Sequence, residues 1–573
     1  MIKRMNKITS LLVAAAAVAS IIPATGVNAA DYKKIDSQEG TIYEAVAYKD
    51  GSFYVDGNTK DGDTEAAYYL NSGNYTELDN VDTGAEVTGT YGENYLDIDN
   101  GDYYVDLNNG SVTDENLSEN NSDDAATALR KSLRKDNDGR YTDVDAVPTL
   151  TELEGAKFSE NWYEAAYTTS AGATVSVYTD VKGKYIDADY NVGKIKIKDA
   201  SNHSATLENT VDGVDFAGNK DANVKVSNSR VVAQDSNYIY RLVDITINAT
   251  GVTQLNGQTV DGTTAISNDG TTVSYKAIQK ISKAQSSDDV DGAKYAKTVT
   301  TYALTDKNAK AVDGNDLITD TNTQFEVVNG KLIAYNTETE GNVTTRAITL
   351  TTSAGYAYTD VSDETSEDAV AVDTDADGNL WRLEGGYVYK FDNADSWDKV
   401  YKVDGAMEKL SVYDQDNMIV WNESDEVYSI VGNQAADETT TDTTTDTTVE
   451  TPAITTGWVQ ATDGTWTYNK ADGTKATGWV LDGAWYYLKA DGVMATGWVK
   501  DGSTWYYLNA SGAMKTGWVL DGSTWYFLQS SGAMKTGWLN DNGTWYYLNA
   551  SGAMLSNTTV DGYKLAASGA WVK

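Results

Sequence analysis

Short runs of aromatic and β-branched residues alternate with Gly, Asn and Asp along most of this chain. Such runs lie at 52–55, 103–107, 231–232, 238–240, 386–391 and 418–421. Runs of this length and composition, bounded by turn residues, are typical of β-strands. Residues 31–432 are therefore predicted to form an all-β body.

One helix is predicted inside this body, at 124–135. Ser122 is the predicted N-terminal cap, acidic residues open the segment and basic residues at 130–135 close it. This order of charges suits the helix dipole, which favours anions at the first turn and cations at the last.

The last 118 residues carry a different pattern, with a period of about 20 residues. Thr-Gly-Trp recurs five times, and successive Trp residues of these copies are 21, 19, 20 and 20 positions apart. A second Trp follows each copy, so that eleven of the fifteen Trp residues lie in this region. A fixed period predicts a repeat array, and indoles placed so regularly indicate a binding surface.

Each repeat is predicted to be one β-hairpin and a connecting loop. In the unit 497–514, Asp-Gly and Ser-Gly mark tight turns, and an aromatic run from Trp505 to Leu508 is typical of a strand. Because a lone hairpin is marginally stable in water, the hairpins are expected to stack as a solenoid. Alternate residues of a strand share a face, so Trp505 and Tyr507 are expected to point one way and Tyr506 the other.

The repeats over about 456–554 resemble the choline-binding repeats of Gram-positive surface proteins and phage lysins. The matching sequence is GWVKDGSTWYYLNASGAMKTGW and its near-copies. The resemblance implies a left-handed β-solenoid that holds choline of cell-wall teichoic acid where two hairpins meet. A quaternary ammonium cannot donate a hydrogen bond, so a cage of aromatic faces is its natural receptor.

Four choline cages are predicted on this resemblance. Each takes two Trp residues from one unit, and one further aromatic residue and a Met from the next. The predicted sets are Trp458, Trp466, Tyr487 and Met494; Trp479, Trp485, Tyr507 and Met514; Trp498, Trp505, Phe527 and Met534; and Trp518, Trp525, Tyr547 and Met554.

Two departures from the repeat pattern limit this set. The first hairpin has Thr467 where later units have Tyr, and beyond Met554 the pattern decays, so this end is expected to be a cap without a fifth cage at Trp538 and Trp545. Two alternatives stay open: the aromatic residues hold the hairpins together, or the ligand is a glycan, as for similar repeats of bacterial glucosyltransferases and clostridial toxins. The recurrent Gly-x-Met before Thr-Gly-Trp favours choline.

The stretch from Asp377 to Trp421 resembles the Asp-Gly-Asn-x-Trp turns of β-propeller repeats. The region 370–432 is also similar to extracellular regions that accompany choline-binding repeats in clostridia. The fold class is therefore predicted to be all-β, with a propeller-like body and a C-terminal hairpin solenoid; stacked β-sandwiches are the alternative for the body.

Residues 1–30 resemble a secretory signal peptide, with basic residues at 3–7, an apolar run at 8–22 and small residues near 27–30. A retained membrane anchor is the alternative, although the run is short for a full span. No membrane contact is expected beyond it. The chain has no Cys, hence no lipid-modified Cys, and its three Pro residues form no Leu-Pro-x-Thr-Gly sorting motif. The repeats are thus expected to hold a secreted protein at the cell wall.

A Thr- and Asp-rich stretch with almost nothing apolar to bury is predicted to be a linker. The predicted division of the chain is a signal peptide at 1–30, the acidic body at 31–432, the linker at 433–455 and the repeat module at 456–573.

Charge separates the two folded parts. The formal net charge is −41; the module 456–573 has eight Lys and eight Asp, whereas 31–455 has 33 basic and 77 acidic residues. A surface this acidic repels nucleic acid and anionic lipid, so no nucleic-acid partner is predicted. The neutral module is expected to dock while the acidic body faces outward, towards a glycan or protein partner or in a structural role.

The segment 373–384 matches the spacing of an EF-hand calcium loop, with Asp373, Asp375, Asp377 and Glu384 as candidate ligands. An EF-hand needs flanking helices, and both flanks here are predicted strands. An ordinary hairpin turn is therefore favoured, with a weak calcium loop as the alternative, and no cofactor is predicted.

Composition also restricts catalysis. Without Cys, and with His203 as the only His, cysteine catalysis and zinc sites with two His ligands are excluded; a Ser-His-Asp triad would need His203, which is expected at the surface. Glycoside hydrolysis needs only two carboxylates, but no pair stands out. No catalytic residue is predicted. A non-catalytic wall protein is favoured, and a wall-attached glycoside hydrolase is the alternative.

Overall fold

The computed structural model describes residues 33–59, 65–71, 73–260, 265–312, 315–337 and 341–432, and the module residues 457–460, 465–470, 475–482, 484–489, 492–501, 504–509, 512, 514–521, 524–529, 532–541, 544–549, 551–560, 562–566 and 568–572. The predicted signal peptide (1–30) and linker (433–455) lie outside these residues. The chain divides into two compact units between Thr439 and Thr440. Strands dominate both units, which confirms the all-β prediction.

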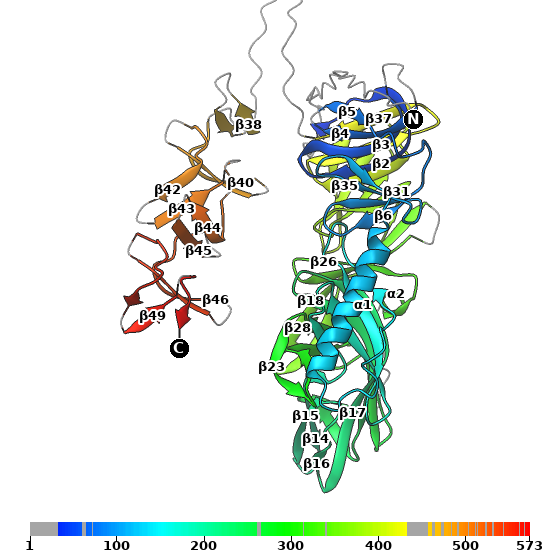
Figure 1. The fold of residues 1–573 in the computed structure, drawn as a ribbon, viewed down its shortest axis with the longest axis vertical. Helices are drawn as coiled ribbons and strands as arrows, with labels where there is room; N and C mark the ends of the chain where they lie inside the picture. Colours follow the sequence, from blue (N-terminus) through cyan, green and yellow to red (C-terminus); the bar gives the residue numbers. More distant parts are fainter. Residues whose placement is uncertain are drawn as a thin grey trace, which may run out of the picture. The chain divides into compact units, whose positions relative to one another are not determined.

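Both ends of the body sequence meet in one group of sheets (Figure 1). One sheet has the order β1 (Lys33–Lys34), β34 (Trp397–Lys402), β33 (Tyr387–Phe391), β32 (Leu380–Glu384) and β31 (Ala371–Thr374). A second has the order β35 (Lys409–Asp414), β36 (Asn417–Asn422), β37 (Val427–Val431), β2 (Gln38–Tyr48), β3 (Ser52–Thr59), β4 (Ala66–Asn71) and β5 (Asn74–Glu77). A third contains β6 (Val87–Tyr91), β7 (Tyr95–Ile98), β8 (Tyr103–Asp106) and β9 (Ser111–Thr113). A short 3-10 turn, Lys49–Gly51, joins β2 to β3.

Buried apolar side chains hold these sheets face to face. One cluster joins Trp381 and Leu383 of β32 to Val412 and Val420 of the next sheet, and another joins Tyr54 of β3 to the third sheet. Face-to-face meanders are what neighbouring propeller blades require. The described strands form no closed barrel, and the propeller-like arrangement stays a prediction.

The middle of the body sequence, between β9 and β31, forms three further sheets. The first has the order β10 (Thr151–Glu152), β11 (Trp162–Thr168), β12 (Thr174–Asp180), β13 (Tyr185–Asp187), β24 (Ala293–Ala296) and β23 (Gln285–Val290). The second has β15 (Ser204–Asn209), β14 (Asn191–Asp199), β19 (Val252–Leu255) and β20 (Gln258–Thr259). The third has β16 (Val214–Phe216), β17 (Asn219–Gln234), β18 (Tyr238–Asn248), β22 (Thr272–Ser282), β25 (Val299–Ala303), β29 (Tyr356–Val361), β28 (Asn342–Ser353), β27 (Lys331–Asn336) and β26 (Gln324–Val328), with β21 (Ile266–Asn268) on β22 and β30 (Thr365–Asp368) on β28.

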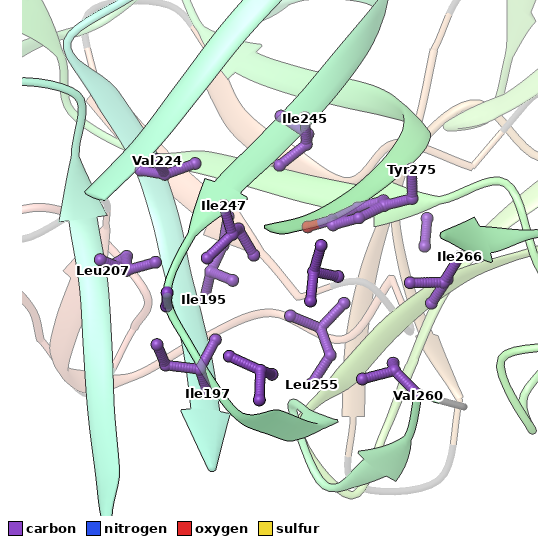
Figure 2. Packing of buried hydrophobic residues seen from close by; sticks show 14 of the residues in the cluster. Ile195, Ile197, Leu207, Val224, Ile245, Ile247, Leu255, Val260, Ile266 and Tyr275 are labelled. Carbon is purple, nitrogen blue, oxygen red and sulfur yellow. The ribbon is translucent and has the colours of Figure 1, made fainter. Parts of the chain in front are cut away.

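Two of these sheets pack as a sandwich. Figure 2 shows Ile195 and Ile197 of β14 facing Ile245 and Ile247 of β18 across a core that Tyr275 of β22 completes. The alternation of buried and exposed residues along β14 is what a sheet with one buried face requires. The sandwich alternative therefore describes this part of the body.

Two α-helices lie in the described part of the body, α1 (Leu117–Asp136) and the short α2 (Asn315–Thr319). The predicted helix, 124–135, was too short, because α1 begins seven residues earlier, at Leu117. Asn116, rather than Ser122, caps it by accepting a hydrogen bond from the Glu119 N–H at 2.9 Å. Its polar first turns are held by tertiary contact, since Asn121 Nδ2 donates to the Tyr91 hydroxyl at 2.9 Å. Figure 1 shows α1 running along the body.

The second unit repeats one antiparallel hairpin, as predicted. The hairpins are β38 (Gly457–Gln460) with β39 (Trp466–Asn469), β40 (Gly478–Asp482) with β41 (Ala484–Leu488), β42 (Gly497–Asp501) with β43 (Thr504–Leu508), β44 (Gly517–Asp521) with β45 (Thr524–Leu528) and β46 (Gly537–Asp541) with β47 (Thr544–Leu548). A three-stranded sheet of β48 (Thr559–Val560), β49 (Tyr563–Leu565) and β50 (Trp571–Val572) follows them.

Candidate functional site

Each hairpin gathers three aromatic rings on one face. In β42–β43 the register places Trp498 opposite Tyr507, and Trp505 lies two residues before Tyr507 on the same face. The Trp498 ring centroid lies 5.1 Å from that of Tyr507 and 6.4 Å from that of Trp505, with interplanar angles of 75° and 86°. Rings at these angles leave π faces uncovered. The shared face of Trp505 and Tyr507 is confirmed.

The next hairpin supplies a fourth ring. Tyr526 of β45 approaches Trp498 to 4.7 Å between centroids, and Tyr506 approaches Trp479 of the preceding hairpin to 4.7 Å. We call each group of four rings a junction cluster. The clusters at the four hairpin junctions are Trp458, Trp466, Tyr468 and Tyr486; Trp479, Trp485, Tyr487 and Tyr506; Trp498, Trp505, Tyr507 and Tyr526; and Trp518, Trp525, Phe527 and Tyr546.

In the predicted cages the aromatic partner from the next unit is one residue after the ring that the structure places against the preceding hairpin. Which of the two rings contacts choline stays a prediction. The structure places Tyr487, Tyr507, Phe527 and Tyr547 against the first Trp of their own hairpins, with centroids 5.1–5.2 Å apart. The ring that crosses to the preceding hairpin is the one directly before, such as Tyr506. Tyr506 lies on the opposite face of the strand from Trp505, as predicted. It is on this opposite face that the strand contacts the preceding hairpin.

This arrangement explains the first departure noted in the sequence. Thr467 occupies the position of Tyr486 and Tyr506, whose rings contact a preceding hairpin. No hairpin precedes β38–β39 in the described part of the module. Thr467 is accordingly buried, and its hydroxyl donates to the Val459 carbonyl oxygen within its own hairpin at 3.3 Å.

The four predicted Met residues connect successive units. The Met514 N–H donates to the Trp485 carbonyl oxygen at 2.8 Å, and the N–H groups of Met494, Met534 and Met554 make the same bond to the second Trp of an earlier hairpin. The thioether of Met494 meets Gly512, where any Cβ would overlap the sulfur, and φ at Gly512 is +85°. Each Met therefore lies beside the predicted Trp and also spaces the repeats.

Two properties of the clusters bear on ligand binding. The second Trp of each hairpin is the exposed one: Trp466, Trp485, Trp505, Trp525 and Trp545 are 38–44% exposed. A carboxylate, which sequence reasoning missed, stands at two of the junctions, since Trp479 Nε1 donates to Asp501 at 3.0 Å and Trp518 Nε1 donates to Asp541 at 2.9 Å. Accessible π faces beside a negative charge suit a cation.

A fifth group of rings lies where none was expected. Tyr563 stands 5.4 Å from Trp538 and 5.4 Å from Trp571, and these three rings with Trp545 line a cavity of about 370 Å³. The sequence around β49 and β50 lacks the run of aromatic residues after the second Trp that the other units have, so the repeat pattern did not indicate this role. The only signal in the sequence was the pair Tyr563 and Trp571 themselves.

Comparisons with known proteins agree with this geometry. The family model of the choline-binding repeat matches residues 480–517 and 515–558. The choline-binding domain of Spr1274 from Streptococcus pneumoniae is 44% identical over 14% of this chain and 96% of that one, with a TM-score of 0.14. The chain belongs to the choline-binding proteins.

Other solved structures align with this choline-binding protein. Choline-binding protein F of S. pneumoniae is 27% identical over 42% of this chain and 76% of that one, with a TM-score of 0.20. The modular autolysin LytC of S. pneumoniae is 27% identical over 20% of this chain and 37% of that one, with a TM-score of 0.12. No curated protein matches the sequence.

In the body of this choline-binding protein, the calcium-like segment is a hairpin turn between β31 and β32. Asp375 accepts hydrogen bonds from the N–H groups of Asp377 and Asn379 and, at 2.9 Å, from Trp381 Nε1. Asp373 pairs with Lys157 and accepts from the Val412 N–H at 2.7 Å. These contacts occupy two of the four candidate ligands, Asp373 and Asp375, and the flanks are strands as predicted. Across the described ranges, no three His, Asp or Glu residues gather as a metal site requires.

The other predictions about the body concern His203 and the membrane. His203 lies in an exposed turn beside Asp199, with 2.7 Å between Nδ1 and Oδ2. This placement confirms the surface position that was predicted for it. Of the helices within the described ranges, none combines the length and the apolar character that spanning a membrane requires.

Proposed function

We propose that this choline-binding protein is secreted and held at a Gram-positive cell wall by choline of teichoic acid, which binds at the hairpin junctions. The observation that carries the proposal is the junction cluster itself, four rings from two consecutive hairpins with an exposed indole. A trimethylammonium group offers no N–H, so π faces are the contacts that favour it over water. Each face contributes about 0.5–1 kcal/mol where it is exposed and about 2 kcal/mol where it is desolvated.

The difference in net charge between the two units supports binding to the wall through the module. The module carries equal numbers of Lys and Asp, whereas 31–455 has 44 more acidic than basic residues. Teichoic-acid phosphates repel such a body, and its excess acid keeps it away from the polymer while the repeats bind. The body then serves as a non-catalytic partner-binding or structural part of the protein.

The fifth ring group extends the proposal to a fifth site. Trp538, Trp545, Tyr563 and Trp571 present a cavity of about 370 Å³ to the same kind of cation. Several weak sites on one chain raise avidity by a factor of about 10² to 10⁴ over a single one.

An amine resin and competing ligands test the proposal. The full chain is expected to bind a resin bearing tertiary amines and to elute with free choline, and to remain bound in the presence of soluble glucan. Elution by glucan without elution by choline would replace choline by a glycan ligand. The variant Trp505→Ala should elute at lower choline concentration than Tyr387→Ala, which removes an aromatic ring from the body.

A further inference from the structure

Three titratable side chains from distant parts of the sequence meet in the body, where the loop between β10 and β11 lies against β31. Lys157 of this loop pairs through Nζ with Oδ1 of Asp373 on β31, and the two residues are 216 positions apart in the sequence. Glu326 of β26 is the third group. Its charge interacts with those of Lys157 and Asp373, and the Thr374 hydroxyl donates a hydrogen bond to it.

The Lys157–Asp373 pair is shielded from water better than a surface ion pair of the same chain. The side chains of Lys157 and Asp373 are 23% and 15% exposed, whereas those of Lys276 and Asp244 are 59% and 31% exposed. Burial disfavours both charges, and so it favours transfer of a proton from the ammonium to the carboxylate. The products of this transfer are a neutral amine, which is a nucleophile, and a carboxylic acid, which it can attack.

The Asp373 carboxyl group is held in one orientation by a neighbouring sheet. Its Oδ2 atom accepts a hydrogen bond from the Val412 N–H of β35 at 2.7 Å, while Oδ1 is the atom paired with Lys157. A nucleophile that adds to Cγ places negative charge on one of the two oxygens. A fixed N–H donor on Oδ2 stabilises that charge, as in an oxyanion hole, and leaves Oδ1 as the departing oxygen.

Glu326 is placed to transfer protons beside this pair. It is 8% exposed, and Val328 of the same strand shares a buried cluster with Leu380 and Phe391 of the sheet that contains β31. Burial raises the pKa of Glu326 to about 8, against the lowering influence of Lys157. A carboxyl group that is protonated near neutral pH can both donate a proton and take one back.

The amine is held near the carboxyl group by contacts of its own loop. Phe158, the residue after Lys157, packs its ring against Tyr48 at 4.9 Å and against Tyr413 at 5.6 Å between centroids. Folding therefore meets the entropic cost of bringing the amine and the carboxyl group together, and a reaction between them is effectively unimolecular.

We propose that Lys157 and Asp373 join through an amide bond that forms within the folded chain. Lys157 Nζ adds to Asp373 Cγ, a C–N bond forms, and the bond from Cγ to Oδ1 breaks. Of the three protons on the ammonium, one stays on the amide nitrogen and two leave with Oδ1 as one molecule of water. Glu326 carries these protons between the two atoms and ends in its initial state. The step consumes no oxidant, reductant or other reactant.

The bond gives the body a covalent cross-link of a kind that its composition does not otherwise allow. The chain has no Cys and hence no disulfide. The amide ties the loop between β10 and β11 to β31, which belongs to a different sheet. A cross-link between residues so far apart in sequence restricts the unfolded chain strongly, and a reducing agent does not break an amide.

Mass spectrometry of the purified full chain tests the proposal. The intact mass is expected to be lower by one water than the mass calculated from the sequence and the observed N-terminus. Trypsin should fail to cleave after Lys157, so that the peptides 141–182 and 347–382 appear as one branched species. An intact mass without the loss of water, with the free peptide 141–157 released in full, would overturn the proposal.

Variants assign the bond to these residues. Lys157→Arg keeps the positive charge but has no amine to acylate, so it should regain the water, lose the branched peptide and melt at a lower temperature. Lys276→Arg, in the exposed pair, is the matched control and should stay linked. Asp373→Asn should form the same bond with loss of ammonia in place of water. A water still missing from Lys157→Arg would place the dehydration elsewhere and overturn the assignment.

The role of Glu326 has its own test. Glu326→Gln should leave the chain folded, as judged by its circular dichroism, but should accumulate the unlinked form, because a Gln side chain cannot transfer the protons. The fraction of branched peptide measures this directly. Complete linkage in folded Glu326→Gln would overturn the role of Glu326 in forming the bond.

Discussion

Some strand pairs of the body join residues hundreds of positions apart, whereas the strands that pair in the described part of the repeat module are neighbours in the sequence. Gln38 pairs with Tyr428 and Lys33 with Tyr401, but Gly497 pairs with Leu508. The body buries whole Tyr and Trp side chains between sheets, and the module keeps the second Trp of every hairpin exposed. The same residue types therefore form a core in one unit and a binding surface in the other.

Cutting the chain between the two units gives the largest expected effect. Cleavage within 433–455 should leave a body that has lost all affinity for choline, a fall of more than about 100-fold, because the multivalent sites lie in the module alone. The released module should keep the affinity of the full chain. Retention of the body on a choline-displaceable resin would contradict the separation of roles.

The released body also tests the hydrolase alternative. It is expected to leave the turbidity of a purified wall suspension unchanged. A fall in turbidity that disappears with a single Asp or Glu replacement would establish the glycoside hydrolase instead.

Removing one indole from each unit contrasts the two roles of Trp. Trp381 is fully buried, so Trp381→Ala should lower the free energy of unfolding of the body by about 3–5 kcal/mol. Trp505 is 39% exposed, and Trp505→Ala should instead weaken choline binding, by about 1–2 kcal/mol at its site. Denaturant unfolding and choline titration of both variants measure this contrast. Equal losses of stability would show that the exposed indoles are packing residues.

A buried carboxylate makes the stability of the body depend on pH. Burial raises the pKa of Glu326 to about 8, against the lowering influence of Lys157. The folded state favours the protonated form of Glu326. The free energy of unfolding is therefore highest below the ordinary pKa of a glutamate, and it falls as the pH rises from that value through about 8. The loss should be on the order of 2–4 kcal/mol. Glu326→Gln should remove this dependence, and the exposed Glu77→Gln should not.

Alanine variants of two glycines in the module distinguish the effect of a steric clash from the effect of backbone strain. A Cβ at Gly512 would overlap the Met494 thioether, whereas nothing lies within 4 Å of a Cβ at Gly517, and both residues have positive φ. Gly517→Ala should cost about 1 kcal/mol through its backbone. Gly512→Ala should cost about 1–2 kcal/mol more, as a lower melting temperature of the module. An equal loss of stability in the two variants would show that the contact of Met494 with Gly512 does not set the spacing of the repeats.

The smallest effects concern the ring that crosses each junction. Tyr506→Ala should weaken choline binding at its site by about 1 kcal/mol, since its ring faces Trp479. Tyr507→Phe should have no effect, because Phe527 occupies the equivalent place in the next hairpin. Choline titration of the two variants distinguishes them. A silent Tyr506→Ala would exclude this ring from the cation site.

Sequence by itself determined the features that depend on local spacing. The period of 20 and the aromatic runs defined the five hairpins, and alternation along a strand correctly grouped Trp505 with Tyr507. Both follow from backbone geometry within a few residues. The strand runs of the body were equally visible, because their turns are local.

Only the tertiary structure decided which faces meet. Tyr506 rather than Tyr507 crosses to Trp479 because the backbone bond of Met514 to Trp485 and the packing of Met494 on Gly512 fix how one hairpin follows another, and neither contact shows in a single repeat. Tyr563 and Trp571 form a fifth ring group through contacts between elements, without the repeat pattern. The start of α1 likewise depends on Tyr91, which is remote in sequence and adjacent only after folding.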